Sequence, residues 1–427
     1  MKRDHVFTVL LLGLLWFGLA RPRCVAADRP KLTVHRANLN STEQQPGDGY
    51  GAAVAVQGDT VVVGAPLANA AYVFQKPANG WQNMTQTAIL TASDDADHFG
   101  ASVAISDDTI VVGAPYTTVN GEVEQGAAYV FVKPPGGWAD MTQTAKLTGL
   151  HLDNKGVDLL GNTVSVSRNT IVVGVPNVNQ GGAALGWGEA LIYVEPQGGW
   201  ADSTETAVLY VNPADYPFLG LGFGVSTAIS GSTVVVGANG CCIDGDVGLG
   251  AAYVYVEPTA GWETTDAYNG ELTGTEVQPG DYFGESVSVD GSTVLVGSPQ
   301  TYSFSVGAAY VYVEPPGGWI SMTQTAELYP LFTIEGSFGQ SVSISGKDVL
   351  IGAPLTAVSH SDQGAVYLFR EPNSGWRSTM KYRAKLTNSP QFYSFGQSVS
   401  IADTTSVVGF SGTFKSNGGV LVFWLAP

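Results

Sequence analysis

Residues 99–115 read Phe-Gly-Ala-Ser-Val-Ala-Ile-Ser-Asp-Asp-Thr-Ile-Val-Val-Gly-Ala-Pro. Two short runs rich in β-branched residues, Ser102–Ser106 and Thr109–Gly113, flank the polar pair Asp107-Asp108. Such a pattern is typical of a β-hairpin with a two-residue turn. The glycine of the opening Phe-Gly pair lies 13 residues before the glycine of the closing Gly-Ala-Pro triplet. This stretch therefore predicts two antiparallel strands joined by a tight turn.

The same unit occurs seven times in the chain. The opening pairs begin at Tyr50, Phe99, Leu160, Phe223, Phe283, Phe338 and Phe395, and the second glycines are Gly64, Gly113, Gly174, Gly237, Gly297, Gly352 and Gly409. The distance between successive copies varies from 49 to 63 residues, whereas the inner spacing never changes. A fixed repeat with variable connections predicts one rigid unit copied seven times.

Each copy continues into two further strands. A variable loop leads to a third apolar run, such as Ala127–Val132, and a Gly-Trp turn leads to a fourth, such as Thr142–Leu147. No helical periodicity lies between them. We therefore expect an all-β fold, a seven-bladed β-propeller of four-stranded antiparallel blades, because closure into a ring hides the strand edges.

The two ends of the chain predict how the ring closes. The last copy stops at its third strand, Val420–Trp424, without a fourth. Ahead of the first copy, Lys31-Leu32-Thr33 matches the fourth-strand residues Lys146-Leu147-Thr148. We therefore expect the N-terminal strand to complete the last blade.

These repeats resemble the Phe-Gly…Gly-Ala-Pro (FG-GAP) repeats of the integrin α-chain head, which is a seven-bladed β-propeller. The resemblance covers residues 30–427, with departures at Leu160, Val175, Asn239 and Phe410. The chain is also similar to secreted repeat proteins in which Gly-Trp-x-x-Met-Thr-Gln-Thr-Ala-Lys-Leu recurs. The resemblance implies the propeller fold and suggests adhesion, but it does not by itself transfer a ligand. Nothing here resembles an integrin stalk, membrane span or cytoplasmic tail.

The first residues predict an export signal. Lys2 and Arg3 precede an apolar run from Val6 to Ala20, and Val25-Ala26-Ala27 is the preferred cleavage site, with Ala20 as the second choice. The alternative is an uncleaved membrane anchor, but about 15 apolar residues are fewer than the roughly 20 that a span needs. We expect a signal peptide at 1–27 and a propeller domain at 28–427. The predicted location is secreted, extracellular or at the cell surface, with no membrane insertion after cleavage. Asn40 and Asn83 lie in candidate glycosylation triplets.

The charge of the chain limits its partners. The formal net charge is −18, and the leader carries four basic residues and one acid, so its removal gives −21. A strongly acidic surface repels nucleic acid and anionic lipid. We therefore expect an extracellular protein or carbohydrate as partner, no nucleic acid, and a monomeric ring.

Function is expected on one face of the ring. In a four-strand meander, the turns between strands one and two and between three and four emerge on one face, the turn face. The other connections emerge on the opposite face, the loop face, and variable loops on a rigid scaffold are where binding residues gather. Mixed acids and aromatics suit a glycan or a basic protein; the alternative is that they are solvated acids and packing rings. The candidate binding residues are Asp94, Asp95, Asp97, His98, Trp187, Asp244, Asp246, Tyr302, His360 and Asp362.

The tryptophans divide into two groups. Trp81, Trp138, Trp200, Trp262, Trp319 and Trp376 share the Gly-Trp turn, which predicts a repeated packing role. Trp187 lies outside that register and is the better ligand candidate.

The sequence gives little support for a metal site or for redox chemistry. Integrin-type propellers hold calcium in Asp-rich loops between the Phe-Gly pair and the Gly-Ala-Pro triplet, where this chain has only a two-residue turn, too short for six to eight oxygen ligands. Asp94-Asp95-x-Asp97 and Asp244-Gly245-Asp246 are looser alternatives, so we expect no cofactor, with calcium as the open alternative. Cys241 and Cys242 form either a vicinal disulfide or two thiols.

Catalytic signatures are absent from the sequence. It contains no Gly-x-Ser-x-Gly elbow and no His-Glu-x-x-His pair. We therefore expect a non-enzymatic binding or adhesion module that uses its loop face. The alternatives are an extracellular polysaccharide hydrolase or lyase and a structural cell-surface or coat protein.

Overall fold

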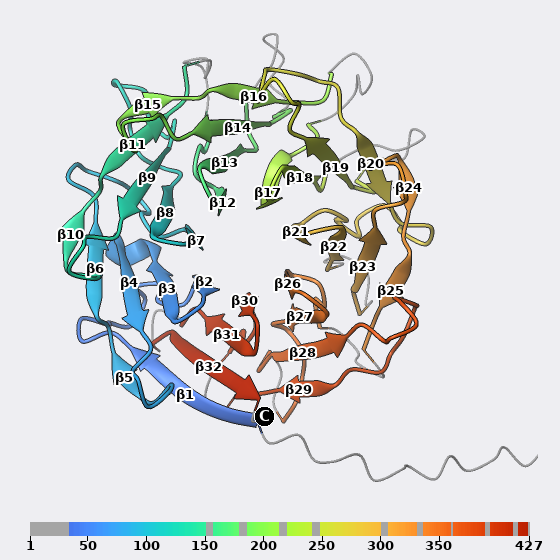
Figure 1. Ribbon diagram of the computed structural model, residues 1–427. Coiled ribbons are helices and arrows are strands. Elements are labelled where there is room, and N and C mark those ends of the chain that lie inside the picture. Colours follow the sequence, from blue (N-terminus) through green and yellow to red (C-terminus); the bar gives the residue numbers. More distant parts are fainter. Residues whose placement is uncertain are drawn as a thin grey trace, which may run out of the picture.

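The computed structural model describes residues 34–150, 157–178, 186–212, 220–240, 248–299, 306–330, 336–359, 362–388, 393–412 and 417–425. Seven antiparallel sheets stand around a central axis like blades (Figure 1). The predicted seven-bladed, all-β propeller is confirmed. Apart from one short 3-10 turn, η1 (Pro66–Ala68), the described elements are strands.

Each blade runs from an inner strand at the axis to an outer strand at the rim. From the axis outward, blades 1 to 3 comprise β2 (Ala53–Gln57), β3 (Thr60–Ala65), β4 (Ala70–Gln75) and β6 (Ala88–Thr91); β7 (Ser102–Ser106), β8 (Thr109–Ala114), β9 (Ala127–Val132) and β11 (Ala145–Thr148); β12 (Thr163–Ser167), β13 (Thr170–Val175), β14 (Glu189–Val194) and β16 (Ala207–Leu209).

Blades 4 to 7 repeat this order. They comprise β17 (Phe223–Ser230), β18 (Thr233–Ala238), β19 (Ala251–Val256) and β20 (Gly270–Thr273); β21 (Ser286–Asp290), β22 (Thr293–Ser298), β23 (Ala308–Val313) and β25 (Ala326–Leu328); β26 (Ser341–Ser345), β27 (Asp348–Ala353), β28 (Ala365–Arg370) and β29 (Ala384–Leu386); β30 (Ser398–Ala402), β31 (Thr405–Phe410), β32 (Gly419–Leu425) and β1 (Val34–Asn40).

The N-terminal strand completes blade 7, as expected, but in a different register. β1 pairs antiparallel with β32 over six positions, from Val34 opposite Leu425 to Leu39 opposite Val420. Leu39, fully buried, therefore takes the place that Leu147 takes in blade 2, where it lies opposite Ala128. The match of Lys31-Leu32-Thr33 to this place was wrong by seven residues, because pairing with β32 and burial of Leu39 select Ala37–Asn40 instead. Lys31, Leu32 and Thr33 lie outside the described residues.

Apolar packing lies between the blades. Each of the seven hydrophobic clusters combines residues of two neighbouring blades; for example, Val73 and Leu90 of blade 1 pack with Phe99 and Tyr129 of blade 2. The six tryptophans of the Gly-Trp turns are 5–9% exposed and belong to these clusters, so their predicted packing role is confirmed.

The outer rim contains a feature that the sequence did not predict. The segment expected to be one fourth strand, Thr142–Leu147, is divided: Met141–Thr142 forms β10, which pairs in parallel with β6 of the preceding blade, and only Ala145–Thr148 belongs to blade 2. β5 (Met84–Thr85), β15 (Ser203–Thr204) and β24 (Met322–Thr323) repeat this pairing with β1, β11 and β20. Thr265 and Thr379 form the corresponding parallel bridges to Leu209 and Leu328.

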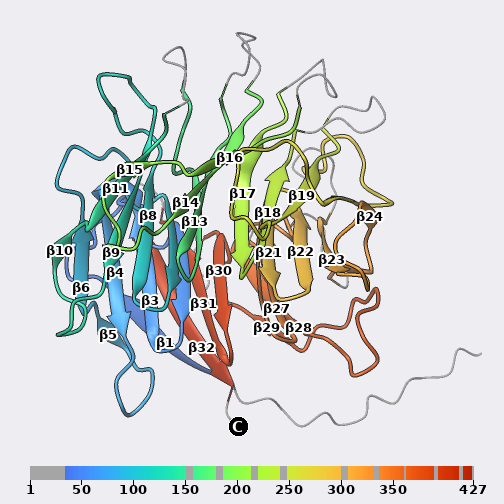
Figure 2. The ribbon, with the colours of Figure 1, turned by 45° about the horizontal axis from the view of Figure 1, so that its top comes forward.

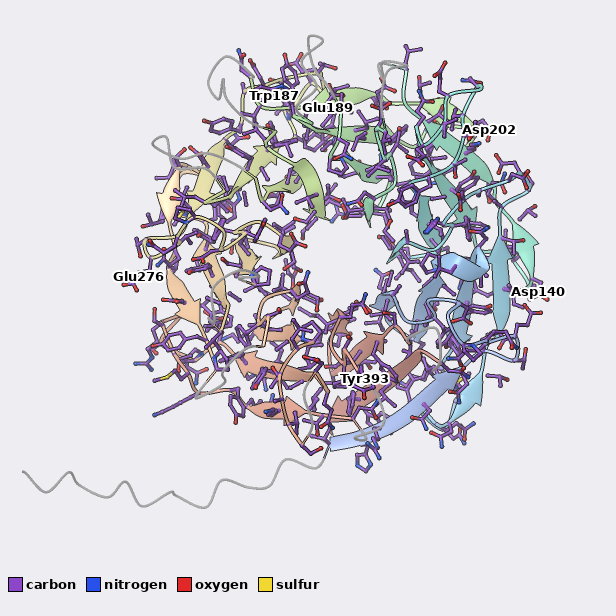
Figure 3. All side chains as sticks on the ribbon, turned by 180° about the vertical axis from the view of Figure 1, so that it is seen from behind. Asp140, Trp187, Glu189, Asp202, Glu276 and Tyr393 are labelled. Carbon is purple, nitrogen blue, oxygen red and sulfur yellow. The ribbon has the colours of Figure 1, made fainter. Side chains whose placement is uncertain are left out.

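We call these segments rim bridges, each a side-chain acceptor followed by two residues beside the neighbouring blade. They are Asn83–Thr85, Asp140–Thr142, Asp202–Thr204, Thr264–Asp266, Ser321–Thr323 and Ser378–Met380. Asp140 and Asp202 lie at the outer rim of the ring (Figure 3). The Met-Thr part of the recurring motif therefore links neighbouring blades.

The loops and turns separate as the topology requires. Tight turns such as that between β2 and β3 lie on the turn face, and the described parts of the longer connections lie at the opposite edge (Figure 2). Among the described residues, no helix has the length and apolar character that a membrane crossing demands.

Candidate functional site

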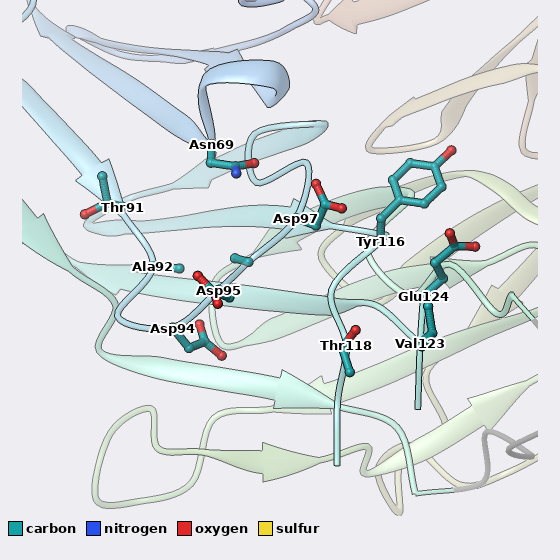
Figure 4. A pocket seen from close by; sticks show the side chains of 11 residues that line it. Asn69, Thr91, Ala92, Asp94, Asp95, Asp97, Tyr116, Thr118, Val123 and Glu124 are labelled. Atoms are coloured by element: carbon teal, nitrogen blue, oxygen red, sulfur yellow. The ribbon is translucent and has the colours of Figure 1, made fainter. Parts of the chain in front are cut away.

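A hollow on the loop face lies between blades 1 and 2 (Figure 4). Its volume is about 710 Å³. Three loops line it: the connection after β3, the connection from β6 to β7, and the connection after β8. The lining residues are Asn69, Thr91, Ala92, Asp94, Asp95, Ala96, Asp97, Tyr116, Thr118, Val123 and Glu124. We call this hollow the acidic groove, because four of these side chains are carboxylates.

Local backbone geometry holds the walls of the acidic groove in place. The 3-10 turn η1 ends at Asn69 in the left-handed conformation, with φ of 50°. The Asn69 Oδ1 accepts a hydrogen bond of 3.2 Å from the Phe99 backbone N–H, which ties this turn to the start of blade 2. In the opposite wall, Val119 and Glu122 exchange two backbone hydrogen bonds of 3.0 and 2.9 Å. The groove therefore has a formed backbone on both sides.

Asp94 is held by a network at the floor of the acidic groove. Its Oδ2 lies 2.5 Å from Lys146 Nζ, and its Oδ1 accepts a hydrogen bond of 2.9 Å from the Tyr129 hydroxyl. Burial alone would raise the pKa of Asp94, but the hydrogen bonds from Lys146 and Tyr129 outweigh it, and the pKa lies below its ordinary value. Burial and the adjacent Asp94 raise the pKa of Tyr129. Asp94 is therefore an ionised, anchored carboxylate.

Asp97 faces solvent at a position where other copies bury their acid. Asp48 and Asp281 also lie two residues before an aromatic-Gly pair, are each 8% exposed, and accept backbone hydrogen bonds within their own loops. The Asp97 side chain is 63% exposed, and its Oδ1 lies 2.9 Å from His98 Nδ1. His98 in turn contacts Tyr116, with ring centroids 4.5 Å apart. Asp97, His98 and Tyr116 thus form a connected polar and aromatic edge of the acidic groove.

The charge balance of the acidic groove favours a cationic or hydrogen-bond-donating ligand. Asp94, Asp95, Asp97 and Glu124 line it, and Lys146 is the cation paired with Asp94. Tyr116, which is 37% exposed, and Val123, which is 67% exposed, supply apolar area beside the acids. Carboxylates next to an exposed ring can accept hydrogen bonds from hydroxyl or ammonium groups while the ring makes apolar contact.

Eight of the eleven residues that line the acidic groove were not among the candidates drawn from sequence, among them Asn69, Tyr116 and Val123. Tyr116 directly follows the Gly-Ala-Pro triplet of blade 2, and Asn69 stands in the loop after the triplet of blade 1. The signal that could have found them is position, because the loop after each triplet always emerges on the loop face.

A second hollow is the central channel. It has a volume of about 310 Å³ and is lined by the inner strands of all seven blades. Most of its wall is small or apolar, but Glu285 accepts hydrogen bonds from Asn239 (2.7 Å) and Gln340 (3.2 Å). Both carboxylate oxygens of Glu285 are thereby occupied, so the channel offers less unfilled polar capacity than the acidic groove.

The remaining predicted residues do not join the acidic groove. Trp187, predicted as a ligand candidate, is 4% exposed and packs in the cluster between blades 3 and 4, because the tight Gly-Trp-Gly loop folds its ring inward. Asp362 lies near the start of blade 7, where its backbone C=O accepts a hydrogen bond of 2.8 Å from Ser394 N–H. Asp244, Asp246, Tyr302, His360, Cys241 and Cys242 lie outside the described residues.

The two candidate glycosylation asparagines are both exposed. Asn40 ends β1. Asn83 begins a rim bridge, where its Oδ1 accepts a hydrogen bond of 2.8 Å from Asn38 N–H. Aspartates occupy the same position in blades 2 and 3, so the asparagine has a structural role besides any modification.

The described part of the chain places no group of three or more His, Cys, Asp or Glu side chains where they could hold a metal ion. For Asp94-Asp95-x-Asp97, the reason is visible: Asp94 is engaged by Lys146 and Tyr129, while Asp97 turns to His98.

Comparison with known proteins concerns the repeats and the fold. The family model of FG-GAP repeats matches residues 34–74, 84–131, 269–312 and 335–369. A search of curated protein sequences gave no match. Among solved structures, the chain is similar to the computationally designed Ika8 protein, at 12% identity and a TM-score of 0.48, over 92% of this chain and 100% of that one. It is also similar to the WD40 domain of coronin from Toxoplasma gondii, at 10% identity and a TM-score of 0.49, over 93% and 88%.

Proposed function

We propose that this FG-GAP repeat protein, a seven-bladed β-propeller of the integrin-like kind, is an extracellular binding module that recognises a protein or glycan through the acidic groove. FG-GAP propellers are typical of extracellular and surface proteins, and the described residues contain no helix suited to crossing a membrane. The predicted signal peptide at 1–27 adds to this proposal. The observation that carries it is the acidic groove itself, a formed hollow with four carboxylates and an exposed tyrosine.

The groove suits recognition better than catalysis. A general acid and base need two groups whose environments separate their pKa values. The acidic groove instead holds one carboxylate, Asp94, clamped in its ionised form, and solvent-facing acids around it. Such a surface recognises donors without activating them, so the proposal includes no catalysis and no resident metal.

The test is crosslinking capture with the purified mature protein as bait, using the surface and secreted fraction of its own organism and a glycan panel in parallel. Tyr116→Ala and Asp97→Asn should each weaken capture of the same partner by about tenfold, since each removes a contact worth roughly 1–2 kcal/mol. The matched control is Asp108→Asn, which removes an exposed acid from the turn face of the same blade.

Two results would contradict the proposal. Equal capture by wild type, Tyr116→Ala and Asp97→Asn would place any binding elsewhere on the ring. Turnover of a polysaccharide that disappears in Asp97→Asn would replace binding with catalysis. A chelator arm measures whether calcium contributes to capture, and the proposal expects no effect.

A further inference from the structure

Six of the seven seams between blades are closed at the rim by the same hydrogen bond. In each, the side chain that begins a rim bridge accepts from an outward-facing backbone N–H in the fourth strand of the preceding blade, at 2.7–3.1 Å. The donor and acceptor pairs are Asn38 and Asn83, Ile89 and Asp140, Lys146 and Asp202, Val208 and Thr264, Glu271 and Ser321, and Glu327 and Ser378. The residues that follow the acceptor then pair with the end of that fourth strand and cover its outer edge.

At the seventh seam, between blades 6 and 7, the described residues form no such closure. The equivalent donor is Lys385 N–H in β29, and no hydrogen bond to it is found within the described residues. β29 is the outermost strand of its sheet, and none of the described strands lies beside its outer edge (Figure 1). The cause is the chain's own connectivity. A rim bridge comes from the link between the third and fourth strands of the next blade, and blade 7 has no such link because its fourth strand is the N-terminal β1.

β1 does not replace the missing bridge. β1 pairs with β32 from Leu39 down to Val34, which lies opposite Leu425. In blade 2, by contrast, the fourth strand pairs with the third only from Ala145 onward, and the rim bridge before it lies beside the preceding blade. In the six rim bridges the acceptor stands six or seven residues before the outward N–H of its own blade's fourth strand; before Asn38 the sequence has Leu32 and Lys31 at these positions, and neither side chain has an acceptor atom.

The burial of the fourth-strand side chains is independent evidence that the outer edge of β29 is uncovered. The fourth-strand leucines of the other blades, Leu39, Leu90, Leu147, Leu209, Leu272 and Leu328, are all 0% exposed, whereas Leu386 is 6% exposed. The alanines two residues earlier are at most 2% exposed in blades 1, 2, 3, 5 and 7, while Ala384 is half-buried. The unpaired edge of β29 is therefore also the least covered.

The charge around this edge is opposite to that of the rest of the protein. The link from β28 to β29 carries Arg377, Lys381 and Arg383 and one acid, Glu371, and Lys385 lies in β29 itself. In blades 3 to 5, the same link carries acids and no basic residue. Arg383 lies 3.6 Å from Asp348, but no ion pair to Lys381 or Lys385 is found in the described part of the chain. An open strand edge thus lies within a basic patch on a protein of net charge −18.

We propose that the outer edge of β29 is a second interaction surface, which takes an extended acidic segment of a partner protein as an added strand. The segment lies parallel to β29, as the rim bridges lie parallel to their neighbours. A carboxylate of the segment accepts from Lys385 N–H, as Asp140 and Asp202 accept from Ile89 N–H of blade 1 and Lys146 N–H of blade 2. Its other acids lie beside Lys381, which leads into β29.

Charge and geometry favour this occupant over two others. A second copy pairing edge to edge would bring two basic patches together, and edge lysines commonly prevent such pairing. The chain's own N-terminal segment leaves the described structure at Val34, at the turn-face end of β1, whereas rim bridges pair with the last residues of a fourth strand, toward the loop face.

The probe is a labelled peptide with the sequence of residues 200–206, Trp-Ala-Asp-Ser-Thr-Glu-Thr, which bridges blades 2 and 3 in the native ring. It is titrated onto the full mature chain, with a control peptide in which Asp and Glu are replaced by Lys. Lys385→Pro removes the outward N–H, and Lys385→Ala keeps it. The charge reversal Lys381→Glu leaves the backbone unchanged. Amide hydrogen exchange is measured at Lys385 and, for comparison, at Lys146, whose N–H donates to Asp202.

The proposal is supported if the peptide binds saturably with a Kd below about 1 mM. Lys385→Pro, Lys381→Glu and the replacements in the control peptide should each lower the affinity about tenfold or more. Lys385→Ala should change it less than about threefold, and the peptide should slow exchange at Lys385 about tenfold. Absence of binding to about 1 mM, or equal binding to Lys385→Pro, overturns the proposal.

Two further outcomes also overturn it, by identifying another occupant. One is a dimer of the free protein that Lys385→Pro dissociates, because a second copy then covers the edge. The other is slow exchange at Lys385 in the free protein that becomes fast when residues 28–33 are deleted, because the N-terminal segment then covers it.

Discussion

The Cα of Gly64 in blade 1 packs directly against the carbonyl oxygen of Gly100 in blade 2, where a Cβ on Gly64 would come 2.0 Å from that oxygen. Gly100 N–H meanwhile donates to the Gly113 C=O of its own blade, at 3.0 Å. In six of the seven repeats the first glycine donates this hydrogen bond to the second glycine of its own copy, and in all seven it contacts the second glycine of the preceding copy. The constant spacing of the two glycines has a physical cause, since both lie where neighbouring blades meet backbone to backbone.

The first prediction concerns this contact. Gly64→Ala should destabilise the ring by about 3 kcal/mol or more, because a Cβ against a backbone oxygen forces the blades apart. Gly136→Ala is the matched control, since nothing lies within 4 Å of a Cβ there. Thermal unfolding of the two variants checks the difference, and equal midpoints would show that the seam can relax.

The second prediction concerns the rim. Asp140→Ala should cost about 1 kcal/mol, because it leaves the Ile89 N–H without its 2.8 Å acceptor. Amide hydrogen exchange at Ile89 should become faster, while exchange in the inner strand β2 stays unchanged. Asp108→Ala, on the turn face, should affect neither quantity. Unchanged exchange at Ile89 would mean that strand pairing by Met141 and Thr142 closes the seam alone.

The third prediction concerns pH. Lys146 and Tyr129 hold the pKa of Asp94 below its ordinary value of 3.8, despite the opposing effect of burial. The resulting stabilisation is present above about pH 4 and is lost as the pH falls through the lowered pKa. Wild type should therefore be more stable than Asp94→Asn at pH 7, by about 1 kcal/mol or less because the side chain is 39% exposed.

Chemical denaturation of wild type and Asp94→Asn at pH 7, 4 and 2.5 measures this difference. It should shrink as the pH falls through the lowered pKa of Asp94, because protonation removes the charge that distinguishes Asp94 from Asn. A difference that stays constant across the series would show that the hydrogen bonds, and not the charge, stabilise this loop.

The fourth prediction concerns closure of the ring. Leu39→Ala should cost about 2–5 kcal/mol, since Leu39 is fully buried in the cluster that joins blades 7 and 1. Leu67→Ala, at a residue 54% exposed, should cost little. Limited proteolysis should cut first near β1 in Leu39→Ala. A loss no larger than that of Leu67→Ala would mean that β1 contributes little to holding the ring closed.

The acidic groove was predictable only in part. Asp94, Asp95, Asp97 and His98 are neighbours in one loop, so their shared position follows from the sequence. The sequence could not show that Asp94 is tied to Lys146, which lies 52 residues away. It also misjudged Trp187, because an isolated tryptophan in a loop looks available until the surrounding packing is known.

The sequence by itself determined the number of blades, the four strands in each and the closure of the ring by the N-terminal strand. These features depend on local spacing, turn residues and strand-forming runs, which repeat seven times and reinforce one another. Tertiary structure alone decided which residues of the N-terminal strand face β32, since pairing and burial of Leu39 act across the whole chain. It also decided that Met141 and Thr142 bridge two blades and that β29 is left uncapped, because a strand edge is satisfied or open only with respect to neighbours that the ring brings together.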